Sequence, residues 1–135
     1  MSWTVDVNVA IALIYNPAGR ILITQRAPHI PSGGLWEFPG GKLEPHETPA
    51  EALLREIKEE VNLEIVEYDF IQQITTQRMD DTLHLYVFLV HQFHGQAEKR
   101  EGQTDLRWVD SETLSQYEFP PTNTPILIWI MKNRS

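Results

Sequence analysis

Three glutamates are grouped shortly after the paired glycines Gly40 and Gly41. Glu56, Glu59 and Glu60 are three and four residues apart, so on an α-helix their carboxylates share one side and repel one another. The last two also fall near the expected end of the helix, where the helix dipole disfavours negative charge. A bound divalent cation is the simplest remedy, and a solvated acidic surface is the alternative. Oxygen ligands without cysteine indicate a hard cation rather than a thiolate zinc site.

The helix that must carry these glutamates has clear start and stop signals. Thr48 is a good N-cap, Pro49 suits the first helical position, and Glu51 completes a capping box with Thr48. Asn62 is expected to end the helix in the left-handed conformation. The apolar residues of this segment recur at helical spacing and form a separate packing face: Ala50, Leu53, Leu54, Ile57 and Val61.

Five further segments are rich in β-forming residues and predict strands. The first two, 5–15 and 20–25, flank a turn sequence and suggest a hairpin. Two longer strands are expected at 64–75 and 82–93, separated by a polar turn, and a short one at 106–109.

A second helix is expected at about 124–132, because Pro125 follows a run of polar residues that favours a helix start. The apolar residues of this segment go nearly all the way round, so a strand remains the alternative. Together these elements predict an α/β protein with a mixed sheet between two helices, in a single domain covering residues 1–135.

Composition limits the classes of function. The chain has 135 residues, 41% of them hydrophobic, which is enough for one domain with a real core. A net charge of −8 argues against a nucleic-acid polymer as partner, because binding its phosphates requires a basic face. There is no cysteine, no secretory leader and no apolar run of about 18 or more residues. We therefore expect a cytoplasmic protein that does not insert into membranes.

The glutamates belong to a longer pattern. It reads G, five residues, E, seven residues, R-E-I, one residue, E-E, one residue, N-L, from Gly41 to Leu63. This pattern closely resembles the Nudix box, with Asn62 where the family has glycine, and asparagine tolerates the positive φ required there. Three further segments resemble the MutT branch of Nudix hydrolases in order and spacing: 35–42, 101–103 and 119–123.

The resemblance implies a fold, a cofactor and roles for particular residues. The fold is an α/β/α sandwich, and the cofactor is Mg²⁺ or Mn²⁺, bridging substrate phosphates to the protein. The implied metal ligands are the Gly40 carbonyl, Glu56, Glu59, Glu60 and Glu101. For the general base, Glu56 is our first choice, Glu101 the second and Glu47 a structural third, while spacing alone leaves the choice open.

Arg55 has two interpretations. It follows Glu51 by four residues, which permits a surface ion pair of small value, whereas the resemblance implies that it orients the glutamates of the box. Both can hold.

Substrate contacts are predicted on both sides of the motif. Arg26 and Lys42 are candidate phosphate contacts, with plain surface charge as the alternative. Asn123 offers a donor and an acceptor to a purine edge, as the matching asparagine does in the MutT branch, although it could instead cap the last helix. Phe119 is a candidate wall of the base pocket. The segment 78–81 does not match the base pocket of that branch.

Three functional hypotheses follow. The first is a Mg²⁺-dependent pyrophosphohydrolase of oxidised or non-standard purine nucleoside triphosphates such as 8-oxo-dGTP. The second keeps this chemistry but changes the substrate to a pyrimidine triphosphate, ADP-ribose or a dinucleoside polyphosphate. The third is a non-catalytic nucleotide-sensing module, which has little need for clustered carboxylates. We expect a small nucleotide as the ligand and a monomer or homodimer as the assembly.

Overall fold

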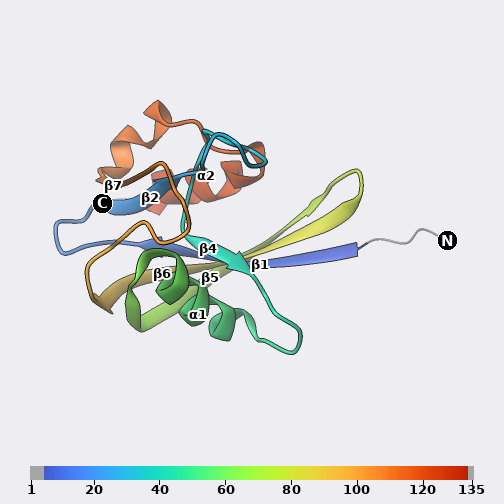
Figure 1. The fold of residues 1–135 in the computed structure, drawn as a ribbon, viewed down its shortest axis with the longest axis horizontal. Helices are drawn as coiled ribbons and strands as arrows, with labels where there is room; N and C mark the ends of the chain where they lie inside the picture. The colour runs from blue at the N-terminus through green and yellow to red at the C-terminus, as the bar shows by residue number, and fades with distance from the viewer. Residues whose placement is uncertain (1–4, 134–135) are drawn as a thin grey trace.

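The computed structural model describes residues 5–133, in which two helices lie on either side of β-strands (Figure 1). The elements in chain order are β1 (Val5–Ile14), β2 (Ile21–Gln25), β3 (Trp36–Glu37), β4 (Gly40–Lys42), α1 (Pro49–Val61), β5 (Glu64–Gln77), β6 (Asp81–His94), β7 (Asp105–Val109), the 3₁₀ turns η1 (Ser111–Gln116) and η2 (Pro121–Asn123), and α2 (Thr124–Asn133).

The described strands form two sheets. In the larger one the order is β4-β1-β6-β5, with β1 parallel to β6 and the other pairs antiparallel. In the smaller one the order is β3-β2-β7, and all pairs are antiparallel. The larger sheet places β4, which carries the paired glycines, beside β1 and close to α1.

The predicted hairpin of residues 5–15 and 20–25 is wrong. Only an isolated bridge between Tyr15 and Ile21 joins the two segments. β1 pairs with β4 and β6, whereas β2 pairs with β3 and β7 in the other sheet. The physical reason is that a turn signal brings the chain round but does not choose strand partners. Both strands satisfy their backbone groups by pairing with segments distant in the sequence.

The remaining elements are confirmed, with small shifts at their ends. β5, β6 and β7 cover the expected strand segments, and 124–133 is a helix, so the strand alternative for it is wrong. The β5–β6 ribbon extends beyond the two helices, next to the start of β1 (Figure 1). No helix within residues 5–133 is both long and apolar enough to cross a membrane.

The core has two parts, one on each face of the larger sheet. Side chains of a strand alternate between faces, so Ala10 and Ala12 of β1 pack with α1, while Ile11 and Leu13 pack on the α2 side. α1 contributes Ala52, Leu53, Ile57 and Val61 to the first part, and α2 contributes Ile126 and Ile130 to the second. The expected α/β/α arrangement, with a mixed sheet between two helices, is confirmed.

The ends of α1 are fixed as the sequence predicts. The Thr48 hydroxyl accepts a hydrogen bond from the Glu51 amide at 3.1 Å, and the Glu51 carboxylate accepts one from the Thr48 amide at 2.8 Å. Asn62 ends the helix with φ 63°, in the left-handed region. The capping box therefore fixes the residue at which α1 begins, and with it the positions of the glutamates along the helix beside β4.

Candidate metal and nucleotide site

Three carboxylates converge beside β4. Glu56 and Glu59 from α1 and Glu101 from the loop between β6 and β7 each offer an oxygen, and these oxygens lie within 4.8 Å of one another. Among residues 5–133 this is the one group of three or more candidate metal ligands whose atoms come together. We call Glu56, Glu59 and Glu101 the carboxylate cluster.

Glu60 lies beneath the cluster rather than in it. Its side chain is buried, and its carboxylate accepts a hydrogen bond from the Gly40 amide at 3.0 Å. Burial raises the pKa of Glu60 to about 8, and the charges of Glu37, Glu101 and Glu56 act in the same direction against the Gly40 hydrogen bond. The same residue lines a cavity of about 230 Å³ together with Gly40 and Glu101.

The paired glycines allow close approaches on both sides of β4. A β-carbon at Gly41 would collide with the Glu56 carboxylate, and one at Gly40 would collide with the backbone carbonyl of Ala10 in β1. Burial, with Glu101 and Glu59 nearby, raises the pKa of Glu56 despite its contact with Arg55. The carboxylate of Glu56 is therefore held directly against the backbone of β4.

Arg55 connects the glutamates of the motif. Its guanidinium donates two hydrogen bonds to Glu47, at 2.7 and 2.8 Å, and others to Glu56 at 2.8 Å and Glu59 at 3.2 Å. The hydrogen bond from Arg55, followed by one from the Glu44 amide, lowers the pKa of Glu47 to about 2. Arg55 is thus bonded to Glu47 rather than to Glu51, which is part of the capping box. These contacts agree with the orienting role that the resemblance implied.

The donor set fits a hard dication. The cluster offers only carboxylate oxygens, which Mg²⁺ and Mn²⁺ prefer. Two of the three carboxylates lie on one helix, and a single arginine compensates only part of their charge. A divalent cation would offset the remaining repulsion and favour the ionised form of Glu56. The predicted ligand roles of Glu60 and of the Gly40 carbonyl stay predictions.

A cleft of about 610 Å³ adjoins the cluster along β4. Predicted substrate contacts from three parts of the chain line it: Arg26, Lys42 and Asn123. Arg26 is tied to Glu37 at 3.2 Å and to the Pro31 carbonyl at 2.9 Å, so its guanidinium is held at the cleft wall. Asn123 is buried, and its amide donates to the Thr122 hydroxyl at 3.4 Å.

Two residues of the 119–123 segment were predicted to contact the base, Phe119 and Asn123, and the structure places them differently. Asn123 lines the cleft, and among residues 5–133 its side chain bonds to Thr122 and not to the backbone of α2. Phe119 does not line the cleft: its ring stacks on Phe38 with centroids 5.0 Å apart and lines a separate cavity. Phe119 therefore supports the wall of the cleft from behind.

Sequence reasoning missed Glu37 and Gln103. Glu37 is a half-buried carboxylate that lines both the cleft and the small cavity beside Glu60, and burial raises its pKa against the opposing effect of Arg26. The sequence feature that could have identified Glu37 is its position as a charged residue between two aromatic residues, Trp36 and Phe38. Gln103 bonds the Glu101 loop to α1. Gln103 is two residues from Glu101 in the sequence, but its contacts depend on the fold.

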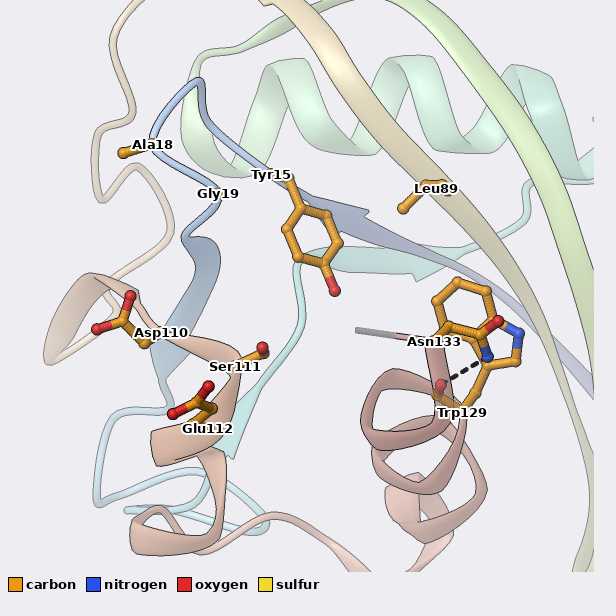
Figure 2. Close-up of a pocket in the computed structure, with 9 residues that line it drawn as sticks. All are labelled: Tyr15, Ala18, Gly19, Leu89, Asp110, Ser111, Glu112, Trp129 and Asn133. Carbon is orange, nitrogen blue, oxygen red and sulfur yellow. Dashed lines mark hydrogen bonds between the residues drawn. The ribbon is translucent and has the colours of Figure 1, made fainter. Parts of the chain in front are cut away.

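A second cavity of about 610 Å³ lies between the turn after β1, η1 and the end of α2 (Figure 2). It shares no lining residue with the cleft or the carboxylate cluster. Its acidic residues include Asp110, which forms an ion pair with Arg20 at 3.5 Å. The two cavities are equal in volume, so volume alone does not identify the functional site. The converging carboxylates identify it.

Comparisons with known proteins identify the family of this chain. The family model described as NUDIX domain matches residues 5–130. The CTP pyrophosphohydrolase of Escherichia coli is 34% identical over 93% of this chain and 92% of its own length. The 8-oxo-dGTP diphosphatase of the same organism is 32% identical over 89% and 92%. A structure from a study of MutT from Aliivibrio salmonicida and Vibrio cholerae is 33% identical, with a TM-score of 0.86, and covers 96% of this chain and 100% of that one.

The fold, the carboxylate cluster beside the cleft and these similarities define a hydrolase of nucleotide phosphoanhydride bonds. The chain belongs to the Nudix family, in its MutT-like branch.

Proposed function

We propose that this protein is a Mg²⁺-dependent nucleoside triphosphate pyrophosphohydrolase that acts on oxidised or non-standard purine nucleotides such as 8-oxo-dGTP. The observation that carries the proposal is the convergence of Glu56, Glu59 and Glu101 beside a cleft that also contains Asn123. Relatives named 8-oxo-dGTP diphosphatase, 32% and 31% identical to this chain, support the choice of substrate. We keep a cytoplasmic location and a monomeric or homodimeric assembly as further predictions.

The reaction adds one water across a phosphoanhydride bond. The new oxygen–phosphorus bond forms as the old one breaks, which gives a nucleoside monophosphate and pyrophosphate. Bound Mg²⁺ would neutralise phosphate charge and lower the pKa of a coordinated water. Glu56, Glu59 and Glu101 are the residues that would hold it. We propose Glu56 as the base that accepts the proton of the attacking water, because Arg55 orients its carboxylate and Gly41, without a side chain, leaves room for it.

Substrate binding would use different residues of the cleft for the phosphates and for the base. Arg26 and Lys42 supply positive charge for the phosphates, and Asn123 supplies a donor and an acceptor for a base edge. Because Asn123 is already buried and held by the 3₁₀ turn η2, it needs little ordering when the base binds.

Cytidine triphosphate is the second candidate substrate. A relative named CTP pyrophosphohydrolase is 34% identical to this chain. In addition, Arg78 at the tip of the β5–β6 ribbon lines the cleft and pairs with Asp81, in the segment that does not match the MutT base pocket. An amide such as Asn123 can pair with a pyrimidine edge as well as with a purine edge.

A pyrophosphate-release assay tests the proposal. The purified protein would be offered 8-oxo-dGTP, the ordinary dNTPs, CTP, ADP-ribose and a dinucleoside polyphosphate, each with Mg²⁺ and each with excess chelator. We expect the highest kcat/KM with 8-oxo-dGTP, no release in chelator, and none from the Glu59→Gln or Glu60→Gln variants. A preference for CTP would support the second candidate, and full activity in chelator would refute both.

A further inference from the structure

The loop that carries Glu101 is exposed, yet it presents its carboxylate to α1 within a cluster only a few ångströms across. An exposed loop does this with precision only if something fixes its backbone. The last carbonyls of α1 are available for this purpose, because the final turn of a helix has no partners of its own for them. The Glu98 amide donates to the Val61 carbonyl at 2.9 Å, and the Arg100 amide donates to the Glu60 carbonyl at 3.2 Å.

Gln103 makes the side-chain bonds that complete this attachment. Its amide nitrogen donates to the Glu60 carbonyl at 3.1 Å, and its amide oxygen accepts from the backbone N–H of Glu101 at 2.9 Å. Gly102 lies between them with φ 73°, a conformation that turns the chain so that Gln103 reaches back over Glu101. The Gln103 side chain is half-buried although its neighbours on both sides are exposed.

The two bonds of Gln103 therefore join the backbone of one cluster residue to the helix that carries the other two. A shorter side chain would not span both partners, and an apolar side chain of equal length would bond to neither. Glu60, whose backbone carbonyl accepts from Gln103, also accepts a hydrogen bond from the Gly40 amide with its carboxylate. The contacts that connect β4, α1 and the Glu101 loop thus meet at Glu60, and Gln103 supplies the side-chain contact to the loop.

We propose that Gln103 is a positioning residue, which sets the distance of the Glu101 carboxylate from Glu56 and Glu59 and so determines the affinity of the cluster for a dication. This inference rests on the proposed function, because it concerns the same cluster. It assigns to Gln103 no contact with substrate or with the reacting atoms.

The test is a set of matched substitutions read out by Mn²⁺ binding without nucleotide. Gln103→Met keeps the length of the side chain and removes both hydrogen bonds. Gln96→Met is the control, because Gln96 lies in the same loop and its exposed side chain makes no hydrogen bond to residues 5–133. We expect the Mn²⁺ dissociation constant, followed by electron paramagnetic resonance, to rise about 10-fold or more for Gln103→Met and to stay unchanged for Gln96→Met.

The Glu101→Gln background separates positioning from general stability. If Gln103 acts through Glu101, adding Gln103→Met to Glu101→Gln weakens Mn²⁺ binding no further. An equal loss in both backgrounds would overturn the inference, as would an unchanged dissociation constant in the single variant. Thermal unfolding of each variant identifies any that is not folded at the assay temperature, and Gln103→Asn, which is too short for both bonds, then replaces Gln103→Met.

The result also distinguishes this inference from the proposed function. If the wild-type protein neither binds Mn²⁺ nor releases pyrophosphate, the proposed function fails. If the wild type does both and Gln103→Met is unchanged in both, only the positioning role fails. A fall in kcat for Gln103→Met, with little change in KM, would agree with a displaced Glu101.

Discussion

Arg55 makes more contacts with the glutamates of the motif than any simple surface pair would require. Its planar guanidinium holds Glu47 with two parallel hydrogen bonds and still reaches Glu56 at 2.8 Å. A lysine carries the same charge but cannot form this fork. Because the positions of Glu47 and Glu56 depend on geometry and not only on charge, replacing Arg55 by lysine should not be conservative.

We therefore expect Arg55→Lys to reduce kcat by about 10- to 100-fold, the range seen when residues that orient metal ligands are lost. Arg20→Lys is the matched control, since the Arg20 side chain has, among residues 5–133, a single exposed ion pair, with Asp110 at 3.5 Å. Steady-state kinetics with the best substrate of the screen would measure the effect. Equal activity of the two variants would contradict the orienting role of Arg55.

Glu60 gives a prediction for pH dependence in chelator. Burial raises its pKa in the folded protein to about 8, from the ordinary value of 4.5 for a glutamate. Between pH 4.5 and pH 8, Glu60 therefore keeps its proton in the folded state and has lost it in the unfolded state. The free energy of unfolding must fall as pH rises through this range. We expect the free energy of unfolding, from urea titrations, to decrease by a few kcal/mol between pH 5 and pH 9 in the wild type.

Glu60→Gln should remove this part of the pH dependence, because glutamine remains neutral and its oxygen can still accept from Gly40. Parallel pH dependence in the wild type and the variant would show that Glu60 does not hold the proton.

Helical spacing predicted the carboxylate cluster only in part. It correctly placed Glu56 and Glu59 on one side of α1, but it could not tell that Glu60 lies deeper, bonded to Gly40, or that Glu101 completes the group. Spacing determines the direction in which a side chain leaves the helix, whereas its depth depends on what packs there. The position of Glu101 depends on contacts more than 40 residues apart in sequence, such as that between Gln103 and Glu60.

At the scale of elements, local signals predicted helices well and strand partners poorly. α1 is specified by residues within a few positions of its ends, such as Thr48 and Asn62. β1 and β2 are specified by partners that the turn between them does not select, so the hairpin prediction failed.

The end of α1 offers a prediction for stability. Asn62 has φ 63° where the related motif has glycine, and a β-carbon without a compensating polar group is unfavourable there. Asn62→Ala should lower the free energy of unfolding by about 1 kcal/mol, whereas Asn62→Gly should leave it unchanged or slightly higher. Urea unfolding of both variants measures the difference. If Asn62→Ala were as stable as Asn62→Gly, the left-handed end of α1 would not be the reason for this residue.

At the scale of the whole molecule, the cluster lies where three separate parts of the fold meet. α1, β4 and the loop after β6 meet at Glu56, Gly41 and Glu101, so a dication bound there is expected to bind the folded chain far better than the unfolded one. A ligand of this kind stabilises the fold by about 2.7 kcal/mol at 100 times its dissociation constant. For a domain of this size that amounts to a rise in Tm of roughly 10 °C.

We expect Mn²⁺ to raise the Tm of the wild type in this way, and to leave that of Glu59→Gln almost unchanged at the same concentration. Glu51→Gln is the control, because Glu51 lies on the same helix but belongs to the capping box, so its Tm should shift with Mn²⁺ as the wild type does. Differential scanning fluorimetry in chelator and in rising Mn²⁺ gives the curves. A shift in Glu59→Gln as large as in the wild type would mean that the cation binds elsewhere, and the carboxylate cluster would then be an acidic surface rather than a metal site.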